Sequence, residues 1–137
     1  MKNNRISWEL YALKLASAAA ERSEDPYIKV GCCCIRHNNS TASTGYNGGP
    51  SGIEINFLDR DLRRKYVIHA EQNALLYCIP GEIKIIATTL LPCNDCLKII
   101  AAYGIKKIVF SDIYEKDDST LHLAKDFGIE LEQIKLT

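Results

Sequence analysis

The sequence predicts an α/β protein of three α/β/α layers, in which a mixed five-stranded sheet lies between helices on both faces. Two observations carry this prediction. Five short segments have the apolar character of strands, and after a hairpin formed by the first two, strands alternate with helix-like segments. A hairpin pairs antiparallel and a strand–helix–strand unit pairs parallel, so both kinds of pairing are expected. The 137 residues suit a single domain, which we expect to span residues 1–137.

The first third of the chain is expected to form one helix and the hairpin. Ser7 is a favoured N-cap residue, and apolar residues recur at helical spacing after it, which predicts a helix to about residue 21. Val30–Ile35 is an apolar run typical of a buried strand. Thr41–Tyr46 is predicted as its partner, because Asn38-Asn39 between the two segments favours a turn.

The middle of the chain combines irregular and helical segments. Residues 47–52 are rich in glycine and are expected to be irregular. The charged stretch Asp59–Lys65 is most simply a solvated helix or loop. A helix is predicted from about His69 to Cys78, where Pro80-Gly81 stops it. The remaining elements are a strand at Ile83–Thr89, a helix at Cys93–Tyr103, a strand at Lys106–Phe110, a helix at Asp117–Phe127 ended by Gly128, and a strand at Ile129–Ile134.

Composition and charge exclude several classes of protein. Hydrophobic residues make up 47% of the chain and charged residues 25%, and the seventeen basic side chains balance seventeen acidic ones. A neutral chain gives no sign of binding long nucleic acid, whereas a small anionic substrate needs only a local basic pocket. No apolar run is long enough to span a bilayer and no secretory signal stands at the start, so we expect no membrane partner and a cytoplasmic location.

The six cysteines fit a reducing compartment better than a disulfide framework. Cys32, Cys33 and Cys34 are consecutive in an apolar stretch, which most simply means core packing, with a second metal site as the alternative. Cys93 and Cys96 have the Cys-x-x-Cys spacing of metal ligands. The cysteines therefore indicate the cytosol and one metal centre.

A histidine and two cysteines carry the chemistry of the sequence. His69 stands two residues before Glu71, and Pro92 directly precedes Cys93, with Cys96 three residues further on. His-x-Glu followed by Pro-Cys-x-x-Cys is typical of zinc nucleobase deaminases, in which the glutamate acts as acid and base without binding the metal. Three protein ligands leave the fourth tetrahedral position open for water, as a catalytic zinc requires. We therefore predict one Zn²⁺ per chain, held by His69, Cys93 and Cys96, with Glu71 as the catalytic residue.

The predicted elements place these ligands at two helix starts, near His69 and Cys93. Helix amino termini favour thiolate over thiol, and open α/β sheets usually bind ligands at the carboxyl ends of their strands, where we expect the helix starts to converge. A redox role for Cys93 and Cys96 would leave His69 and Glu71 unexplained. A purely structural zinc would need a fourth ligand, and Cys78, the nearest candidate, lies about 13 Å along the helix that starts at His69.

Four further segments carry a resemblance to a known family. They are Arg22-Ser23-Glu24-Asp25-Pro26 with Val30-Gly31, Gly45-Tyr46-Asn47-Gly48-Gly49-Pro50, His69-Ala70-Glu71-Gln72-Asn73-Ala74, and Gly104-Ile105-Lys106-Lys107 with Tyr114 beyond. They resemble the corresponding segments of deoxycytidylate (dCMP) deaminases, which belong to the cytidine deaminase superfamily. The resemblance runs from about residue 11 to residue 130.

The chain also departs from the family pattern. Cys32 stands where the family usually has alanine, and Ile86-Ala87-Thr88-Thr89 replaces the usual Tyr-Val-Thr strand. The segment Ser51–Ile68 is short and holds no cysteine or histidine, so we expect no second zinc there. Many relatives are regulated by dCTP and dTTP, and the short segment leaves these effectors open here. Because relatives form hexamers or smaller assemblies, a homo-oligomer is expected.

The resemblance implies a cytidine-deaminase-like fold and a zinc-dependent hydrolase that converts dCMP to dUMP and ammonia, which supplies dUMP for thymidylate synthesis. The substrate contacts that it implies are Asn47 for the nucleoside, the backbone N–H of Ala70 for the cytosine O2, Tyr114 for the base or sugar, and Arg22, Ser23 and Lys29 for the phosphate. An ion pair between Arg22 and Asp25 is the structural alternative for that loop.

Other functions stay open on the sequence alone. A deaminase could act on dCTP as well as dCMP, on free cytidine nucleosides, or on bases in nucleic acid, although the last activity would favour a basic groove bearing aromatic residues. The chain could also be a non-enzymatic domain that binds zinc or a nucleotide. Such a domain would not need Glu71, because binding zinc does not require that carboxylate.

Overall fold

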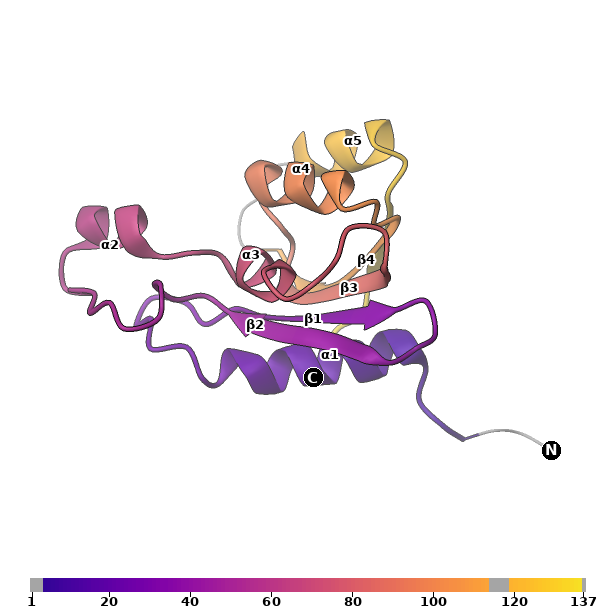
Figure 1. The fold of residues 1–137 in the computed structure, drawn as a ribbon, viewed down its shortest axis with the longest axis horizontal. Helices are drawn as coiled ribbons and strands as arrows, with labels where there is room; N and C mark the ends of the chain where they lie inside the picture. Colours follow the sequence, from indigo (N-terminus) through magenta and orange to yellow (C-terminus); the bar gives the residue numbers. More distant parts are fainter. Residues whose placement is uncertain (1–3, 114–118, 137) are drawn as a thin grey trace.

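The structure is a computed structural model that describes residues 4–113 and 119–136 (Figure 1). Its helices are α1 (Trp8–Ala20), α2 (Arg60–Tyr66), α3 (Ala70–Leu75), α4 (Asn94–Ala102) and α5 (Ser119–Asp126). Its strands are β1 (Gly31–Arg36), β2 (Thr41–Tyr46), β3 (Ile83–Leu90), β4 (Lys107–Asp112) and β5 (Glu130–Gln133). Each helix and strand predicted from the sequence is present, with shifts of a few residues at most ends.

The strands form one mixed sheet in the order β2-β1-β3-β4-β5. β1 pairs antiparallel with β2 and with β3, whereas β3, β4 and β5 run parallel. In the predicted hairpin turn, Asn39 has φ 69°, the left-handed conformation that asparagine tolerates. Parallel neighbours need a crossover, which α4 provides after β3 and α5 after β4. The predicted α/β/α fold with a mixed five-stranded sheet is confirmed.

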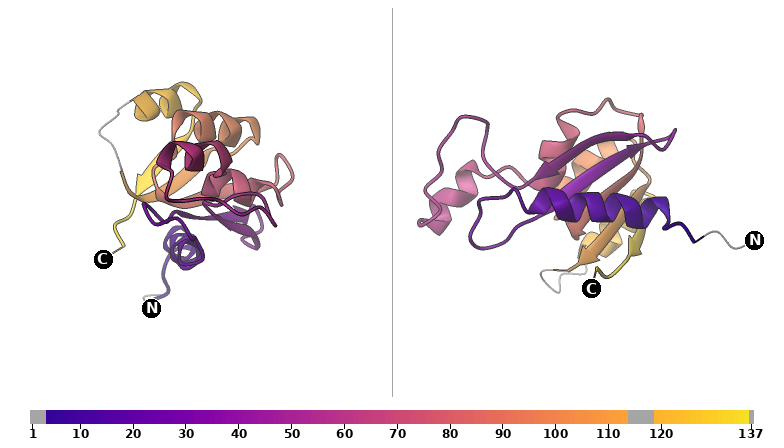
Figure 2. Two further views of the ribbon diagram at one scale, coloured as in Figure 1. Left: turned by 90° about the vertical axis from the view of Figure 1, so that its left-hand side faces the viewer. Right: turned by 90° about the horizontal axis from the view of Figure 1, so that it is seen from below.

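One face of the sheet is covered by α1, which crosses the strands when the molecule is seen from below (Figure 2). The apolar side of this helix packs on strand residues that point the same way, namely Cys33, Ile35, Ile85, Ala87 and Val109. The approach is close because β1 begins with Gly31: a Cβ atom there would lie 1.8 Å from the carbonyl oxygen of Ala16. Glycine at this position therefore lets the backbone of α1 lie directly on β1.

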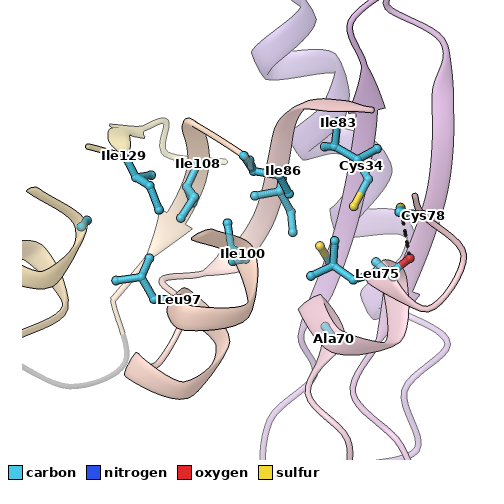
Figure 3. Close-up of a cluster of buried hydrophobic side chains, with 14 of the residues drawn as sticks. Cys34, Ala70, Leu75, Cys78, Ile83, Ile86, Leu97, Ile100, Ile108 and Ile129 are labelled. Atoms are coloured by element: carbon cyan, nitrogen blue, oxygen red, sulfur yellow. Dashed lines mark hydrogen bonds between the residues drawn. The ribbon is translucent and has the colours of Figure 1, made fainter. Parts of the chain in front are cut away.

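The opposite face is covered by α3, α4 and α5 (Figure 1). Figure 3 shows the core on this side, where Leu75, Leu97 and Ile100 meet Ile86 and Ile108 of the sheet. Side chains alternate along a strand, so Cys32 and Cys34 point into this core while Cys33 points toward α1. All three thiols are fully buried, and burial raises the pKa of Cys33 to about 12. The prediction of core packing for these cysteines is confirmed.

α2 agrees with the solvated helix or loop expected for the charged stretch, whereas α3 is shorter than predicted. α2 lies beyond the end of the sheet, and none of its residues is buried (Figure 1). The helix predicted to reach Cys78 ends at Leu75, because the next amide groups bond three residues back: Tyr77 N–H donates to Ala74 O and Cys78 N–H to Leu75 O. In residues 4–113 and 119–136, no helix is long and apolar enough to cross a membrane.

The close contact at Gly31 gives a test of this packing. Gly31→Ala should lower the free energy of unfolding by at least about 1–3 kcal/mol, because the added methyl group forces α1 off β1. Gly48→Ala is the matched control, since a Cβ there meets only the Tyr46 ring at ordinary contact distances of 3.8 and 3.9 Å. Urea unfolding of both variants measures the difference, and equal midpoints would contradict the packing described.

Candidate active site

The three predicted zinc ligands lie at the starts of α3 and α4. His69 occupies the N-cap position of α3 and Cys93 that of α4, each with extended backbone angles. An N-cap side chain normally accepts a hydrogen bond from the first turn of its helix, but neither of these does. Cys96 lies one turn into α4 and is buried. The imidazole and the two thiols are therefore free to face a common ligand.

The distances among these side chains fit a zinc ion. His69 Nδ1 lies 3.3 Å from Cys96 Sγ and 3.5 Å from Cys93 Sγ, and all three ligand atoms lie within 4.8 Å of one another. Tetrahedral zinc with bonds of roughly 2.0–2.3 Å separates its ligand atoms by about 3.6 Å. Within the described ranges, no other three His, Cys, Asp or Glu side chains converge in this way. The consecutive cysteines Cys32–Cys34 therefore do not form a second metal site there. The donor set and its spacing thus suit one zinc ion.

Hydrogen bonds within the site favour a thiolate at Cys93. A hydrogen bond from Cys96 and another from the His69 ring lower the pKa of Cys93 to about 4. The same hydrogen bond to Cys93, together with burial, raises the pKa of Cys96. Gln72 donates its side-chain N–H to Cys96 Sγ over 3.7 Å, which helps that sulfur to carry negative charge. Zinc needs thiolates, so these contacts prepare Cys93 for the metal, whereas Cys96 gives up its proton when the metal binds.

Glu71 lies beside the ligands but outside the ligand group. Its side chain is buried, with 4% of the residue exposed, and burial raises its pKa. A carboxyl group whose proton is held more tightly than in water is suited to exchanging protons near neutral pH. Asn73, two residues along, donates to Tyr46 O over 2.8 Å and fixes the first turn of α3 against the end of β2.

Glu71, His69 and Cys93 open into one cleft of about 500 Å³, a size that suits a small-molecule ligand. Its walls come from Ile28, Val30, Asn47, Arg63, Arg64, Val67, Ala70, Leu90, Leu91, Pro92, Asn94, Ile113 and Thr120. Leu90 ends β3 and Ile113 follows β4, so the cleft lies at the carboxyl ends of these parallel strands. This is the edge at which the sequence predicted the site.

Asn47 reaches the cleft, but most of its hydrogen bonds are internal. Its Nδ2 donates to Ile28 O over 2.9 Å and to Asp25 Oδ2 over 3.2 Å, and its Oδ1 accepts from Val30 N–H over 2.8 Å. These bonds hold the wall of the cleft that leads into β1. One lone pair of Oδ1 is left for a ligand.

The residues predicted for the phosphate do not line this cleft. Ser23 is buried, and its hydroxyl donates to Asn47 O over 2.8 Å. Arg22 and Lys29 are exposed, and Lys29 lines a smaller adjoining hollow of about 300 Å³. The alternative ion pair between Arg22 and Asp25 is wrong, because Asp25 pairs with Arg63 of α2. Tyr114 lies outside the described residues.

Four polar or charged residues of the cleft were missed by reasoning from the sequence. Arg63 and Arg64 belong to the charged stretch that most simply indicated a solvated surface, and charge alone does not reveal that they face a cleft. Asn94 and Thr120 bridge α4 and α5, where the Thr120 hydroxyl donates to Asn94 Oδ1 over 2.9 Å. Asn94 directly follows Cys93, and its position within Cys-x-x-Cys was the signal available for it.

Comparison with known proteins agrees with this geometry. The family described as the cytidine and deoxycytidylate deaminase zinc-binding region matches residues 6–112 of the chain. The chain belongs to this family. Its curated relatives include the deoxycytidylate deaminase of Mus musculus, 33% identical in an alignment of 130 residues that covers 87% of this chain and 73% of the relative. The deoxycytidylate deaminase of Homo sapiens is 34% identical in an alignment of 128 residues that covers 85% of this chain and 72% of the relative.

A solved structure of the same family shares the fold. The dCMP deaminase of cyanophage S-TIM5, crystallised in complex with dCMP and dUMP, superposes with a TM-score of 0.80 at 30% identity. The match covers 95% of this chain and 100% of that one. The cytidine-deaminase-like fold predicted from the resemblance is therefore confirmed.

The metal centre can be tested by counting zinc. Cys93→Ala should lower bound zinc from one ion per chain to well below one, because two ligands hold the metal far more weakly than three. Cys78→Ala is the matched control: its thiol lies elsewhere, bonded to Ala74 O, and zinc should be retained. Elemental analysis of both purified proteins gives the answer, and full zinc in Cys93→Ala would refute the assignment.

Proposed function

We propose that this chain is a zinc-dependent hydrolase that deaminates dCMP to dUMP and ammonia and so supplies dUMP for thymidylate synthesis. The observation that carries the proposal is the convergence of His69, Cys93 and Cys96 beside the buried Glu71 in one cleft. Relatives named deoxycytidylate deaminases and a neighbour crystallised with dCMP and dUMP support this substrate. Residues 1–137 act as one domain in this proposal.

The reaction divides between the metal and Glu71. Zinc, when bound by His69, Cys93 and Cys96, supplies an activated water for attack on C4 of cytosine. Glu71 takes up a proton from that water and delivers it to N3 of the base. It then takes a second proton, from the hydroxyl now on C4, and passes it to the amino group, so that the C4–N bond breaks and ammonia leaves. Its buried position supports this role, because a carboxyl with a raised pKa both accepts and returns protons near neutral pH.

The base and sugar are held by groups already at the cleft. The N–H of Ala70 lies in the first turn of α3, where backbone N–H groups have no carbonyl partner within the helix. Because Ala70 also lines the cleft, this N–H is suited to bind the cytosine O2. Asn47 offers its remaining lone pair to the nucleoside. Tyr114 stays a prediction for the contact with base or sugar.

Arg64 is the cation best suited to the phosphate. It lines the cleft and, among the described residues, forms no ion pair, whereas the guanidinium of Arg63 is engaged by Asp25. Arg22, Ser23 and Lys29 were predicted for this role, and of these Lys29 lines the adjoining hollow, whose wall also carries Asp112. dCTP is the second candidate substrate, carried over from the sequence, and its longer phosphate chain would reach Lys29 only past that carboxylate.

Assembly and location complete the proposal. Leu76, Tyr77 and Ile79 are 68%, 74% and 68% exposed after the end of α3, an apolar surface that supports a homo-oligomer. A reducing cytoplasm suits Cys93 and Cys96, because a disulfide between them would remove two zinc ligands. Activity measured in the presence of dCTP and of dTTP tests whether either nucleotide acts as an effector.

Glu71→Gln tests the division of labour. The variant should keep one zinc per chain, since Glu71 is not a ligand, and lose at least about 10²–10⁴-fold in turnover of dCMP. Ammonia release and elemental analysis on the same sample separate the two effects. Glu82→Gln, which alters a partly buried ion pair with Arg36 outside the cleft, is the control and should keep full activity. Near-normal turnover by zinc-loaded Glu71→Gln would contradict the mechanism.

Arg64→Met tests how the phosphate is read. Because a charge-assisted hydrogen bond contributes about 1.5–3 kcal/mol, kcat/KM for dCMP should fall about tenfold to a hundredfold. kcat/KM for deoxycytidine, which has no phosphate, should fall much less. Lys65→Met, the neighbouring exposed cation that does not line the cleft, is the matched control. Assays on dCMP, dCTP and deoxycytidine side by side also decide the substrate, and equal efficiency of the unaltered protein on all three would overturn the proposal.

A further inference from the structure

α2 lacks the apolar contacts that usually hold a helix in place. It has seven residues, five of them charged, and none is buried. A helix this short is marginal in water without tertiary contacts. In Figure 2 it stands apart from the layers formed by the other helices and the sheet. Yet Arg63 and Arg64 of this helix line the cleft, so something must fix its position.

The contacts that fix it gather on Asp25 and its neighbour Tyr27. The Arg63 guanidinium donates twice to Asp25 Oδ2, with Nε at 2.6 Å and Nη2 also in contact. The guanidinium carbons of Arg63 and Arg60 lie 5.3 and 5.0 Å from the centre of the Tyr27 ring. The chain after α2 is tied by the bridge between Gly48 and Ile68.

Asp25 joins α2 to the opposite wall of the cleft. Its side chain is completely buried, and its oxygens also accept from Tyr27 N–H over 2.9 Å, from Ile28 N–H over 3.4 Å and from Asn47 Nδ2. In the described chain, Arg63 is the cation that compensates this buried charge. The same carboxylate therefore holds the wall formed by Ile28 and Asn47 and the helix that carries Arg64.

We propose that the ion pair between Asp25 and Arg63 holds α2 in position at the cleft and so determines how strongly the substrate's phosphate is recognised. The inference rests on the proposed function for its substrate. Arg63 acts through its neighbour: with its own charge engaged by Asp25, it places Arg64 as the cation available to the phosphate. Arg63 is thus a positioning residue, and selectivity for the nucleotide over the nucleoside depends on it.

The test compares Arg63→Met with Arg63→Lys and Arg60→Met. In Arg63→Met, KM for dCMP should rise and the ratio of kcat/KM for dCMP to that for deoxycytidine should fall at least about tenfold. kcat at saturating dCMP should change much less, because Glu71 and the zinc ligands are untouched. Arg63→Lys keeps the charge and should restore part of the ratio, while Arg60→Met, which removes only a ring contact, should leave it near normal. An equal loss of kcat/KM for both substrates, or no loss for dCMP, would overturn the proposed role of the ion pair.

Amide hydrogen exchange tests, without any substrate, whether the ion pair between Asp25 and Arg63 holds α2 in place. Amides of Arg60–Tyr66 should exchange at least about tenfold faster in zinc-loaded Arg63→Met, while those of β3 and α4 stay protected. Unchanged exchange in α2 would overturn the proposal. If the unaltered protein shows no preference for dCMP over deoxycytidine, the proposed substrate fails, and exchange alone still decides whether Arg63 holds α2.

Discussion

The site depends on bringing the starts of two helices together. His69 and Cys96 come from helices separated by β3, yet their ligand atoms lie 3.3 Å apart. The sheet makes this possible, because β3 runs between β1 and β4 and delivers α4 to the same face and the same edge as α3. Gly45 of β2 lets α3 approach closely, since a Cβ there would lie 2.6 Å from Ala70 O. Without that approach the histidine would stand away from the cysteines.

Two buried carboxyl groups in the same cleft region have opposite environments. Asp25 is surrounded by N–H donors and an arginine, so its negative charge is fully compensated and serves the architecture. Glu71 is buried beside the ligand group, and its pKa is raised because the effect of burial outweighs a backbone hydrogen bond and the nearby His69. The contrast separates a carboxylate that holds structure from one suited to moving protons. Burial alone does not distinguish them; the arginine paired with Asp25 does.

The sequence was most informative where function and structure are local. Thr41–Tyr46 matches β2 at both ends, because the Asn38-Asn39 turn signal that sets its start stands within a few residues of it. The zinc ligands follow from a spaced motif. The partner of Asp25 was not visible, since Arg63 lies 38 residues away and looks like a surface charge. Ser23 fits the family's pattern, yet its hydroxyl bonds to Asn47 O, a contact that depends on how two distant loops meet.

α2 contributes to the cleft without contributing to the core. Since none of its residues is buried, changes at most of its positions cost the fold little. Mutations in this segment can therefore accumulate and alter the ligands that the cleft accepts while the metal ligands and Glu71 stay unchanged. In evolutionary terms, the segment that selects the substrate is free to diverge separately from the residues that carry the chemistry, and one scaffold can give rise to enzymes with different preferences.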